Sequence, residues 1–316
     1  MDNSMNKRVY GVLGISSLRA NWNADFSGYP KTLSDGRIFG SDKAFKYPMK
    51  KMWDNEGQKV LYIKSTNFKT DKKGEVSLIP RTLRERYESL FDAEDFKDVK
   101  KVLTNLMASV DVKNFGATFA EAGCNIAITG AVQIGQGMNK YDDAAVTEQP
   151  ILSPFRDGSD KKGKEGEDAK NSTIGTKIMT DEAHYFYPFV VNPSAYKELV
   201  SLGVTEGYTE DDYANFKRTA ITAATAYDTN SKSGCENEFA VFIETEPNVY
   251  LPNMSEYVSF TKDGQTNIIK MEFADVLAAL GDKIKSVEIY YNPQTTKLSG
   301  SPAKAKLFNI LTQQEV

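Results

Sequence analysis

Few side chains of this 316-residue sequence are suited to acid–base or covalent chemistry. The chain has a single histidine, His184, and histidine is the usual general base near neutral pH. His184 lies in an aromatic segment, where a buried, hydrogen-bonded structural histidine is the favoured interpretation. The two cysteines, Cys124 and Cys235, have neither a CxxC nor a metal-ligand spacing. Such cysteine usage is typical of a reducing cytoplasm.

Three glycines, Gly130, Gly135 and Gly137, follow a predicted strand and could suggest a phosphate loop. Their spacing is neither GxGxxG nor GxxxxGKS, and no helix clearly begins behind them, so a mononucleotide site is not indicated. Because glycine has no side chain, an approach of this backbone to an RNA phosphate stays open.

The connection Ser16–Lys46 follows a strand predicted for Arg8–Ser16 and leads into a basic helix. It is rich in Asn, Gly, Ser and aromatic residues, and the aromatics argue against disorder. A loop of this length in a compact domain is usually functional when it is ordered. We therefore expect a binding site in this connection.

The helix behind the connection is predicted to be amphipathic. Ser41 is a suitable N-cap, and Asp42 in the first turn favours the helix dipole. Pro48 is expected to kink or restart the helix. Opposite the apolar stripe, the sequence places four lysines: Lys43, Lys46, Lys50 and Lys51.

The net charge of −4 is unevenly distributed. Residues 1–81 hold 15 Lys and Arg against 8 Asp and Glu, so they carry +7 and the remainder carries −11. A basic N-terminal part on an acidic body favours a positive groove for nucleic acid, and scattered surface lysines are the alternative.

The rest of the pattern predicts an α+β fold with insertions. Further strands are predicted at Lys59–Ser65, from His184 to Val191, and at Glu238–Glu244, Ile268–Phe273 and Ser286–Tyr291. Helices are predicted within residues 80–109 and at Ala195–Leu202, Asp211–Tyr227 and Phe273–Ile284. Residues 111–137 are expected to return to strand and loop. No apolar run approaches the roughly 20 residues that cross a bilayer, and the polar N-terminus is unlike a signal peptide.

Residues 154–177 are dense in Lys, Asp, Glu, Gly and Ser. This composition alone is as typical of a solvated or disordered loop as of an ordered arm. The flanks Ile151–Phe155 and Ile174–Met179 are predicted to pair as an extended hairpin. An arm of this kind cannot bury itself within its own domain, so it needs a partner.

Several segments together resemble the backbone subunit of type I-B CRISPR interference complexes, a family of the RAMP superfamily. The likeness runs from residue 8 to about residue 245, and the order of the motifs carries it. The segments are Val9–Ile15, Asn21–Phe26, Asp35–Asp42, Asp111–Gly116, Ile128–Ile134 and His184–Pro193.

The resemblance implies a modified RRM or ferredoxin-like palm with a helical finger insertion and a protruding β-hairpin thumb. Residues 1–66 would form the first part of the palm and residues 67–110 the fingers. Residues 111–150 would return to the palm with the glycine-bearing loop, residues 151–183 would form the thumb, and residues 184–316 would complete the palm and add C-terminal elements.

The resemblance also implies a function. Copies of the chain would polymerise head-to-tail along one CRISPR RNA in the cytoplasm and present its bases for pairing with target DNA, so Watson–Crick pairing would read the sequence. The other expected partners are the large, small, five-prime-end and RNA-processing subunits of the Cascade complex. No membrane partner, catalytic residue, metal or cofactor is expected, and the subunit would not be an enzyme.

Carried onto this sequence, the resemblance assigns two sets of residues. The expected RNA-binding residues are Arg19, Asn21, Trp22, Asn23, Arg37, Ser41, Lys43, Lys46, Lys50, Gln133, Gln136, Met138, Asn139, Ser231 and Lys232. The expected thumb and neighbour contacts are Phe155, Arg156, Lys177 and Met179. For Trp22 the alternative is a core residue, and for any single lysine it is a solvated charge. We further expect charge reversal at Lys43, Lys46 and Lys50 to weaken RNA-dependent assembly without unfolding the monomer.

Two other functions are alternatives. A RAMP-type endoribonuclease would use His184 as a general base, or Asp25 with a metal, as in backbone subunits of RNA-cleaving type III complexes. A generic single-stranded RNA-binding protein would lack the CRISPR context. Because the chain is acidic overall, we expect RNA affinity to come from polymerisation and multivalency rather than from one subunit.

Overall fold

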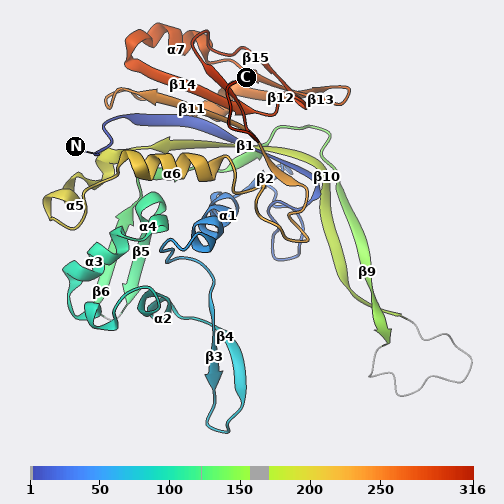
Figure 1. Ribbon diagram of the computed structural model, residues 1–316. Helices are drawn as coiled ribbons and strands as arrows, with labels where there is room; N and C mark the ends of the chain where they lie inside the picture. Colours follow the sequence, from blue (N-terminus) through green and yellow to red (C-terminus); the bar gives the residue numbers. More distant parts are fainter. Residues whose placement is uncertain (1–2, 122, 157–170) are drawn as a thin grey trace, which may run out of the picture.

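The computed structural model describes residues 3–121, 123–156 and 171–316. In this part of the chain, a nine-stranded sheet forms the centre of a mixed α/β fold (Figure 1). From edge to edge, its main path runs through β16 (Lys306–Asn309), β14 (Ile284–Tyr291), β11 (Cys235–Thr245), β1 (Arg8–Ala20), β10 (Asn171–Val191), β8 (Gly137–Asn139) and β2 (Phe39–Gly40). Two further strands pair with β10, namely β7 (Val132–Ile134) and β9 (Val146–Arg156).

The middle strand, β1, is buried on both faces and pairs antiparallel with β10 and β11. Val9 and Leu13 belong to one core cluster, and Tyr10 and Val12 belong to the other. This division follows from the period of two of an extended chain. Each face of the sheet therefore needs its own cover.

Helices α1 (Asp42–Asn55) and α6 (Glu210–Ala220) contribute to the core on one face. The other face is covered by a small sheet and by helix α7 (Ala274–Leu280), which lie above the main sheet in Figure 1. The strands of the small sheet are β12 (Val258–Asp263), β13 (Thr266–Met271) and β15 (Thr296–Ser299).

The N-terminus of α1 forms as predicted. The hydroxyl of Ser41 accepts a hydrogen bond from the amide of Ala44 at 3.3 Å, which makes Ser41 the N-cap. The predicted restart at Pro48 is wrong, because α1 continues through this residue. Pro48 is buried together with Phe45 and Trp53, and this packing outweighs the hydrogen bond that proline removes.

The insertion between α1 and the return to the sheet contains a hairpin as well as helices. Its elements are β3 (Thr66–Thr70), β4 (Val76–Pro80), α2 (Leu83–Glu88), η1 (Ala93–Lys97), α3 (Val99–Met107), α4 (Val110–Phe115), β5 (Gly116–Glu121) and β6 (Cys124–Thr129). The return to strand expected from Asp111 is wrong for its first residues, because α4 continues to Phe115. The remaining short helices are η2 (Pro193–Tyr196), α5 (Lys197–Ser201), η3 (Met254–Tyr257) and η4 (Gly281–Lys283).

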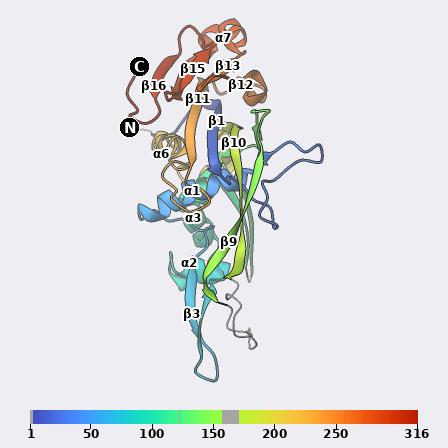
Figure 2. The same cartoon turned by 90° about the vertical axis from the view of Figure 1, so that its right-hand side faces the viewer.

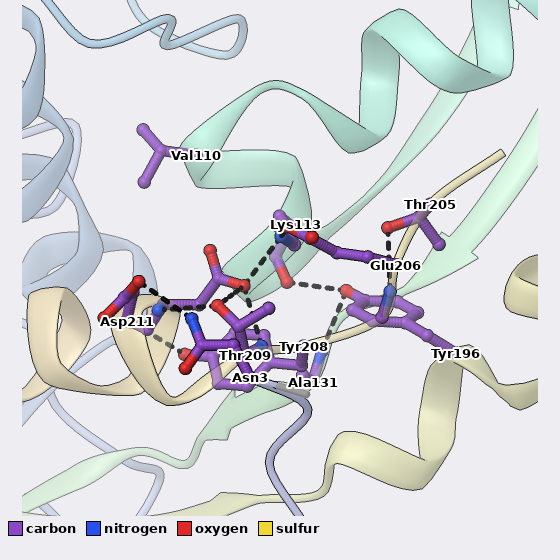
Figure 3. Close-up of polar contacts among 12 residues, drawn as sticks. Asn3, Val110, Lys113, Ala131, Tyr196, Thr205, Glu206, Tyr208, Thr209 and Asp211 are labelled. Atoms are coloured by element: carbon purple, nitrogen blue, oxygen red, sulfur yellow. Dashed lines mark hydrogen bonds and ion pairs between the residues drawn. The ribbon is translucent and has the colours of Figure 1, made fainter. Parts of the chain in front are cut away.

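Polar contacts tie the helical insertion to the body of the protein (Figure 3). The hydroxyl of Tyr196 donates to the carbonyl of Lys113 at 2.6 Å and accepts from the amide of Ala131 at 3.1 Å. The ammonium of Lys113 pairs with Asp212 of α6 at 2.7 Å. Helix α4, helix α6 and the residue before β7 are thus held together.

The strand predicted at Lys59–Ser65 is not present. The amides of Leu61 and Tyr62 instead donate to the two carboxylate oxygens of Asp111, each at 2.8 Å. Backbone donors that bind a side chain in this way are not free to join a strand ladder. The prediction failed because Asp111 is distant in the sequence.

Two element boundaries also differ from the predictions. Strand β1 continues past Ser16 to Ala20, so the long connection starts at Asn21. Helix α6 ends at Ala220 rather than Tyr227. The side chain of Asn237 donates to the carbonyl of Ala220 at 2.8 Å and accepts from the amide of Ala224 at 2.9 Å, so it binds backbone groups at this helix end.

The predicted hairpin is present, because β9 pairs with β10 and Ile151 lies opposite Gly175, but residues 176–179 lie opposite residues 147–150 rather than opposite the predicted segment Ile151–Phe155. This hairpin projects from the body in both views (Figures 1 and 2). The segment 157–170 of the predicted arm lies outside the described residues. No helix in the described ranges is long and apolar enough to span a membrane.

His184 is 1% exposed and joins the main sheet to the small sheet. Its Nδ1 lies 2.8 Å from Glu238 of β11, and its Nε2 lies 2.9 Å from Glu182 of β10. Lys262 of β12 pairs with Glu182 at 2.6 Å, and the imidazole stacks on Phe260 of β12 at 3.8 Å between ring centroids. The interpretation of His184 as a buried structural histidine is confirmed.

The charges around His184 decide its protonation. Burial alone would lower the pKa of His184, but the charges and hydrogen bonds of Glu238 and Glu182 outweigh burial and raise the pKa above its ordinary value of 6.5. The imidazolium form is therefore the one that the fold stabilises. Its contribution to stability is complete below the unfolded pKa and is lost as pH rises through the raised folded pKa.

We expect His184→Gln to lower the free energy of unfolding by roughly 3 kcal/mol at about pH 6, because it leaves the buried carboxylate of Glu238 without its cation and leaves Glu182 with Lys262 alone. The difference from the unsubstituted protein should shrink as pH rises above the folded pKa. Urea denaturation over a pH series measures it, and the single imidazole resonance reports the titration directly. A difference that is the same at every pH would contradict this role.

Candidate nucleic-acid interface

Asn21 organises the connection between β1 and β2. Its side-chain amide donates to the carbonyl of Gly28 at 2.8 Å and to the carbonyl of Ile178 at 3.1 Å. Its backbone amide donates to the carbonyl of Ser231 at 2.9 Å. One buried residue thus joins the connection, strand β10 and the loop before β11.

Lys232 lies beside this junction and has no carboxylate partner in the described structure. Its ammonium donates to the carbonyls of Asn21 and Trp22 and lies 5.7 Å from the ring centroid of Trp22. Burial lowers the pKa of Lys232 below its usual range. A bound anion would stabilise its charged form, so the site is suited to a phosphate.

The strand pair β2 and β8 continues this surface. Phe39 pairs with Met138, and Gly40 pairs with Gly137. The side-chain oxygen of Asn23 accepts a hydrogen bond from the amide of Ser41 at 2.7 Å. The structure thus brings together four segments that the sequence analysis selected: residues 19–23, 39–41, 137–139 and 231–232. We call these four segments the polar end of the sheet.

The glycines of this region are required by packing. A Cβ at Gly137 would lie 2.3 Å from the ring of Tyr187, and a Cβ at Gly40 would lie 1.8 Å from the hydroxyl of the same residue. A Cβ at Gly130 would be similarly close to the backbone around Gly116, and a Cβ at Gly135 would be close to the ring of Pro188. Contacts within the protein therefore account for these glycines without a bound phosphate.

Trp22 is 1% exposed, so the alternative of a core residue is the one that the structure shows. Its indole donates to the hydroxyl of Tyr187 and packs edge-on against Phe45 at 6.3 Å between ring centroids. Met179 is also buried, at 6% exposure. In this conformation neither side chain presents a surface to a base.

The lysines of α1 differ from one another. Lys43 is exposed, which the predicted phosphate contact requires. Lys46 pairs with Asp42 at 2.9 Å. Lys50 points to the interior, where its ammonium lies 3.5 Å from the fully buried carboxylate of Asp111 and donates to the carbonyl of Tyr62. Burial lowers the pKa of Lys50 and outweighs the attraction of Asp111.

The remaining predicted residues lie at the edges of this surface or beyond it. Arg19, the last residue but one of β1, has a left-handed backbone conformation (φ 49°) and an exposed side chain, and exposed Arg37 pairs with Asp35 at 2.8 Å. The side chain of Asn139 accepts from the amide of His184 and donates to the carbonyl of Tyr141, each at 2.8 Å.

Gln133 is exposed on β7, at the far end of β10 from the polar end, and exposed Gln136 lies between β7 and β8. Lys177 is half-buried on β10, opposite Gln149. Phe155 and Arg156 end β9, and their side chains lie outside the described part of the structure. None of these predicted contacts is tested by the structure.

Asp25 holds a turn. One of its carboxylate oxygens accepts from the amides of Ser27 at 2.8 Å and Tyr29 at 3.0 Å. Within the described ranges, no group of three or more His, Cys, Asp or Glu side chains is arranged to hold a metal ion. The geometry gives Asp25 a structural use.

The sequence analysis missed Phe26, whose exposure of 112% exceeds that of every other large apolar side chain among the described residues. It lies next to the turn held by Asp25, in the connection after β1. A fully exposed aromatic ring next to a polar surface is suited to stacking on an unpaired base. The signal in the sequence that could have indicated this residue was a phenylalanine within a polar loop.

Comparison with solved structures defines the class of fold. The chain is similar to one described as "CRISPR RNA-guided surveillance complex, pre-nicking", with a TM-score of 0.53 and 14% sequence identity. The similarity covers 95% of this chain and 96% of that chain. No curated protein matches the sequence.

The family follows from the sequence itself. Residues 7–278 match the family model described as CRISPR-associated protein Cas7. The match covers most of the chain, so this protein belongs to the Cas7 family. The RAMP-type assignment of the sequence analysis is thereby confirmed at the level of the family.

The buried contact of Lys50 with Asp111 argues against the expectation that charge reversal at Lys43, Lys46 and Lys50 leaves the monomer folded. We expect Lys50→Glu to lower the free energy of unfolding by roughly 3 kcal/mol, because it places a second carboxylate beside buried Asp111. Lys43→Glu, on an exposed site of the same helix, should change it by less than about 0.5 kcal/mol. Chemical denaturation of both variants measures the effect. Equal, small changes would contradict the structural role of Lys50.

Proposed function

We propose that this Cas7-family chain is a non-catalytic CRISPR RNA-binding subunit that forms the backbone of an interference complex. The observation that carries the proposal is the polar end of the sheet, where four separate segments meet and one of them supplies the partly buried Lys232, which has no carboxylate partner among the described residues. Such a surface suits the backbone of a single-stranded nucleic acid, because its donors and charge can follow successive phosphates.

The arrangement of the hairpin β9–β10 also supports a repeating assembly. Strand β10 pairs with β1 as far as Thr180 and continues beyond it into the projecting hairpin. The hairpin and the polar end of the sheet therefore share one end of the molecule (Figure 1). We propose that this hairpin is the thumb, that the sheet is a modified RRM-like palm, and that copies contact one another head-to-tail along the guide.

The type I-B subtype and the wider set of partners remain part of the proposal. In it, guide bases are presented for pairing with target DNA, and the large, small, five-prime-end and RNA-processing subunits complete the complex. The polar end would hold the guide mainly through phosphate and sugar contacts. Exposed Arg19 and Ser231 are its accessible members, exposed Lys43 lies just beyond its segment 39–41, and Asn21 and Trp22 act by positioning the loop.

Purification of the complex from cells that carry the CRISPR locus tests the proposal, with sequencing of the bound RNA as the measurement. We expect one class of RNA, in which each spacer is flanked by repeat sequence. Mixed cellular RNA would indicate a generic single-stranded RNA-binding protein. A chain that stays monomeric and carries no RNA would contradict the proposed function.

A further inference from the structure

The hairpin β3–β4 has an apolar face with no partner inside the chain. Every residue of the two strands is exposed except Ile79, which is half-buried. The register places Phe68 opposite Leu78 and Thr70 opposite Val76, so the three apolar side chains share one face. The exposed fraction is 72% for Phe68, 61% for Leu78 and 65% for Val76.

The hairpin is nevertheless well formed. The side chain of Asp71 accepts hydrogen bonds from the amides of Lys73 at 2.8 Å and Glu75 at 2.9 Å, and Gly74 supplies the left-handed backbone of the turn (φ 85°). Figures 1 and 2 show that it projects from the body of the molecule. Two-stranded hairpins alone are marginally stable in water, and contiguous exposed apolar side chains mark interaction sites. The hairpin is thus a preformed arm suited to docking.

The arm is also basic. Five cations lie on it or at its base, against the two acids of the turn, Asp71 and Glu75. The cations are Lys64, Lys69, Lys72, Lys73 and Arg81, and none of them makes an ion pair in the described structure. The surface that covers this arm should therefore be apolar at its centre and acidic around it.

The chain carries a surface of this kind at α5 and the turn after it. Val200 and Leu202 are 44% and 55% exposed. Glu198 is exposed, and the side chain of Glu206 is 75% exposed, with one long contact of 3.8 Å to Lys113 (Figure 3). Lys197 of α5 is exposed as well, so the two acids leave this surface with a small negative excess, on a part of the chain after position 81 that carries −11 in total.

The α5 surface and the arm are separate projections of the molecule (Figure 1). Two complementary patches on different parts of one chain favour a heterologous contact between copies, and contacts of this kind build open arrays. Each inner copy of such an array can offer its arm to one neighbour and its α5 surface to the other. The arm is then covered in every copy except one at an end.

We propose that the apolar face of β3–β4 docks on the α5 surface of a second copy of this chain, with Lys72 and Lys73 next to its Glu198 and Glu206. This contact rests on the proposed function, because it is one between neighbours in an assembly on guide RNA. It adds a second contact between copies to that of the thumb. A nucleic-acid partner is less favoured, because Val76 and Leu78 offer no flat ring for stacking.

Charge exchange between the two patches tests the contact. One variant carries Lys72→Glu and Lys73→Glu, a second carries Glu198→Lys and Glu206→Lys, and a third carries all four changes. The measurement is the protein concentration needed for half-maximal assembly on a fixed guide RNA, followed by mass photometry. We expect each double variant to raise it about tenfold and the fourfold variant to restore most of the loss.

A matched control is Lys304→Glu, an exposed charge reversal in the C-terminal part of the chain, which should leave assembly unchanged. Phe68→Ser with Leu78→Ser tests the apolar part and should weaken assembly with an unchanged melting temperature, since both side chains are exposed.

The outcomes separate this contact from the proposed function. Losses that add in the fourfold variant would overturn the contact between copies. So would a Lys72/Lys73 variant that binds guide RNA more weakly as a monomer, since that result would make the arm a nucleic-acid contact. If the unsubstituted protein bound no guide RNA, the proposed function itself would fail.

Discussion

The burial of β1, β11 and the part of β10 from Met179 to Val191 on both faces is the constraint on which the rest of the structure depends. Apolar side chains of these strands face α1 and α6 on one side and the small sheet with α7 on the other. A sheet covered in this way can offer polar groups only at its ends and edges and in its insertions. The polar end of the sheet and the two projecting hairpins are where this sequence places them.

Buried charges connect these layers. The His184 cluster joins β10, β11 and β12, and the pair of Lys50 and Asp111 joins α1 to α4. Both groups of charges are costly to remove from water. Both also form hydrogen bonds with backbone or side-chain groups that would otherwise lack a partner. Lys232 differs from them, because it is partly buried against carbonyl oxygens with no carboxylate partner in the described ranges. That difference is the reason why we propose Lys232, and not Lys50, as an RNA contact.

Local signals in the sequence were enough for the strand at Val9, the Ser41 cap, the start of α6 and the pairing of β9 with β10. Contacts between distant residues were not. Asp111 removes the backbone donors of Leu61 and Tyr62 from any strand, and it redirects Lys50 away from solvent. Likewise, Gly40 and Gly137 are explained by the position of Tyr187, together with Trp22 at Gly40. Periodicity and residue type give the element, whereas the orientation of a single lysine or glycine depends on a partner that the sequence does not name.

If copies of this chain assemble head-to-tail along the guide, as we propose, the length of the guide RNA sets the number of copies in the assembly. The most direct test of this claim is the mass of complexes formed by this chain on CRISPR RNAs whose spacers are lengthened in small steps, measured by native mass spectrometry. We expect the mass to rise by one subunit for each constant increment of spacer length. A complex with the same number of copies on every RNA would contradict it.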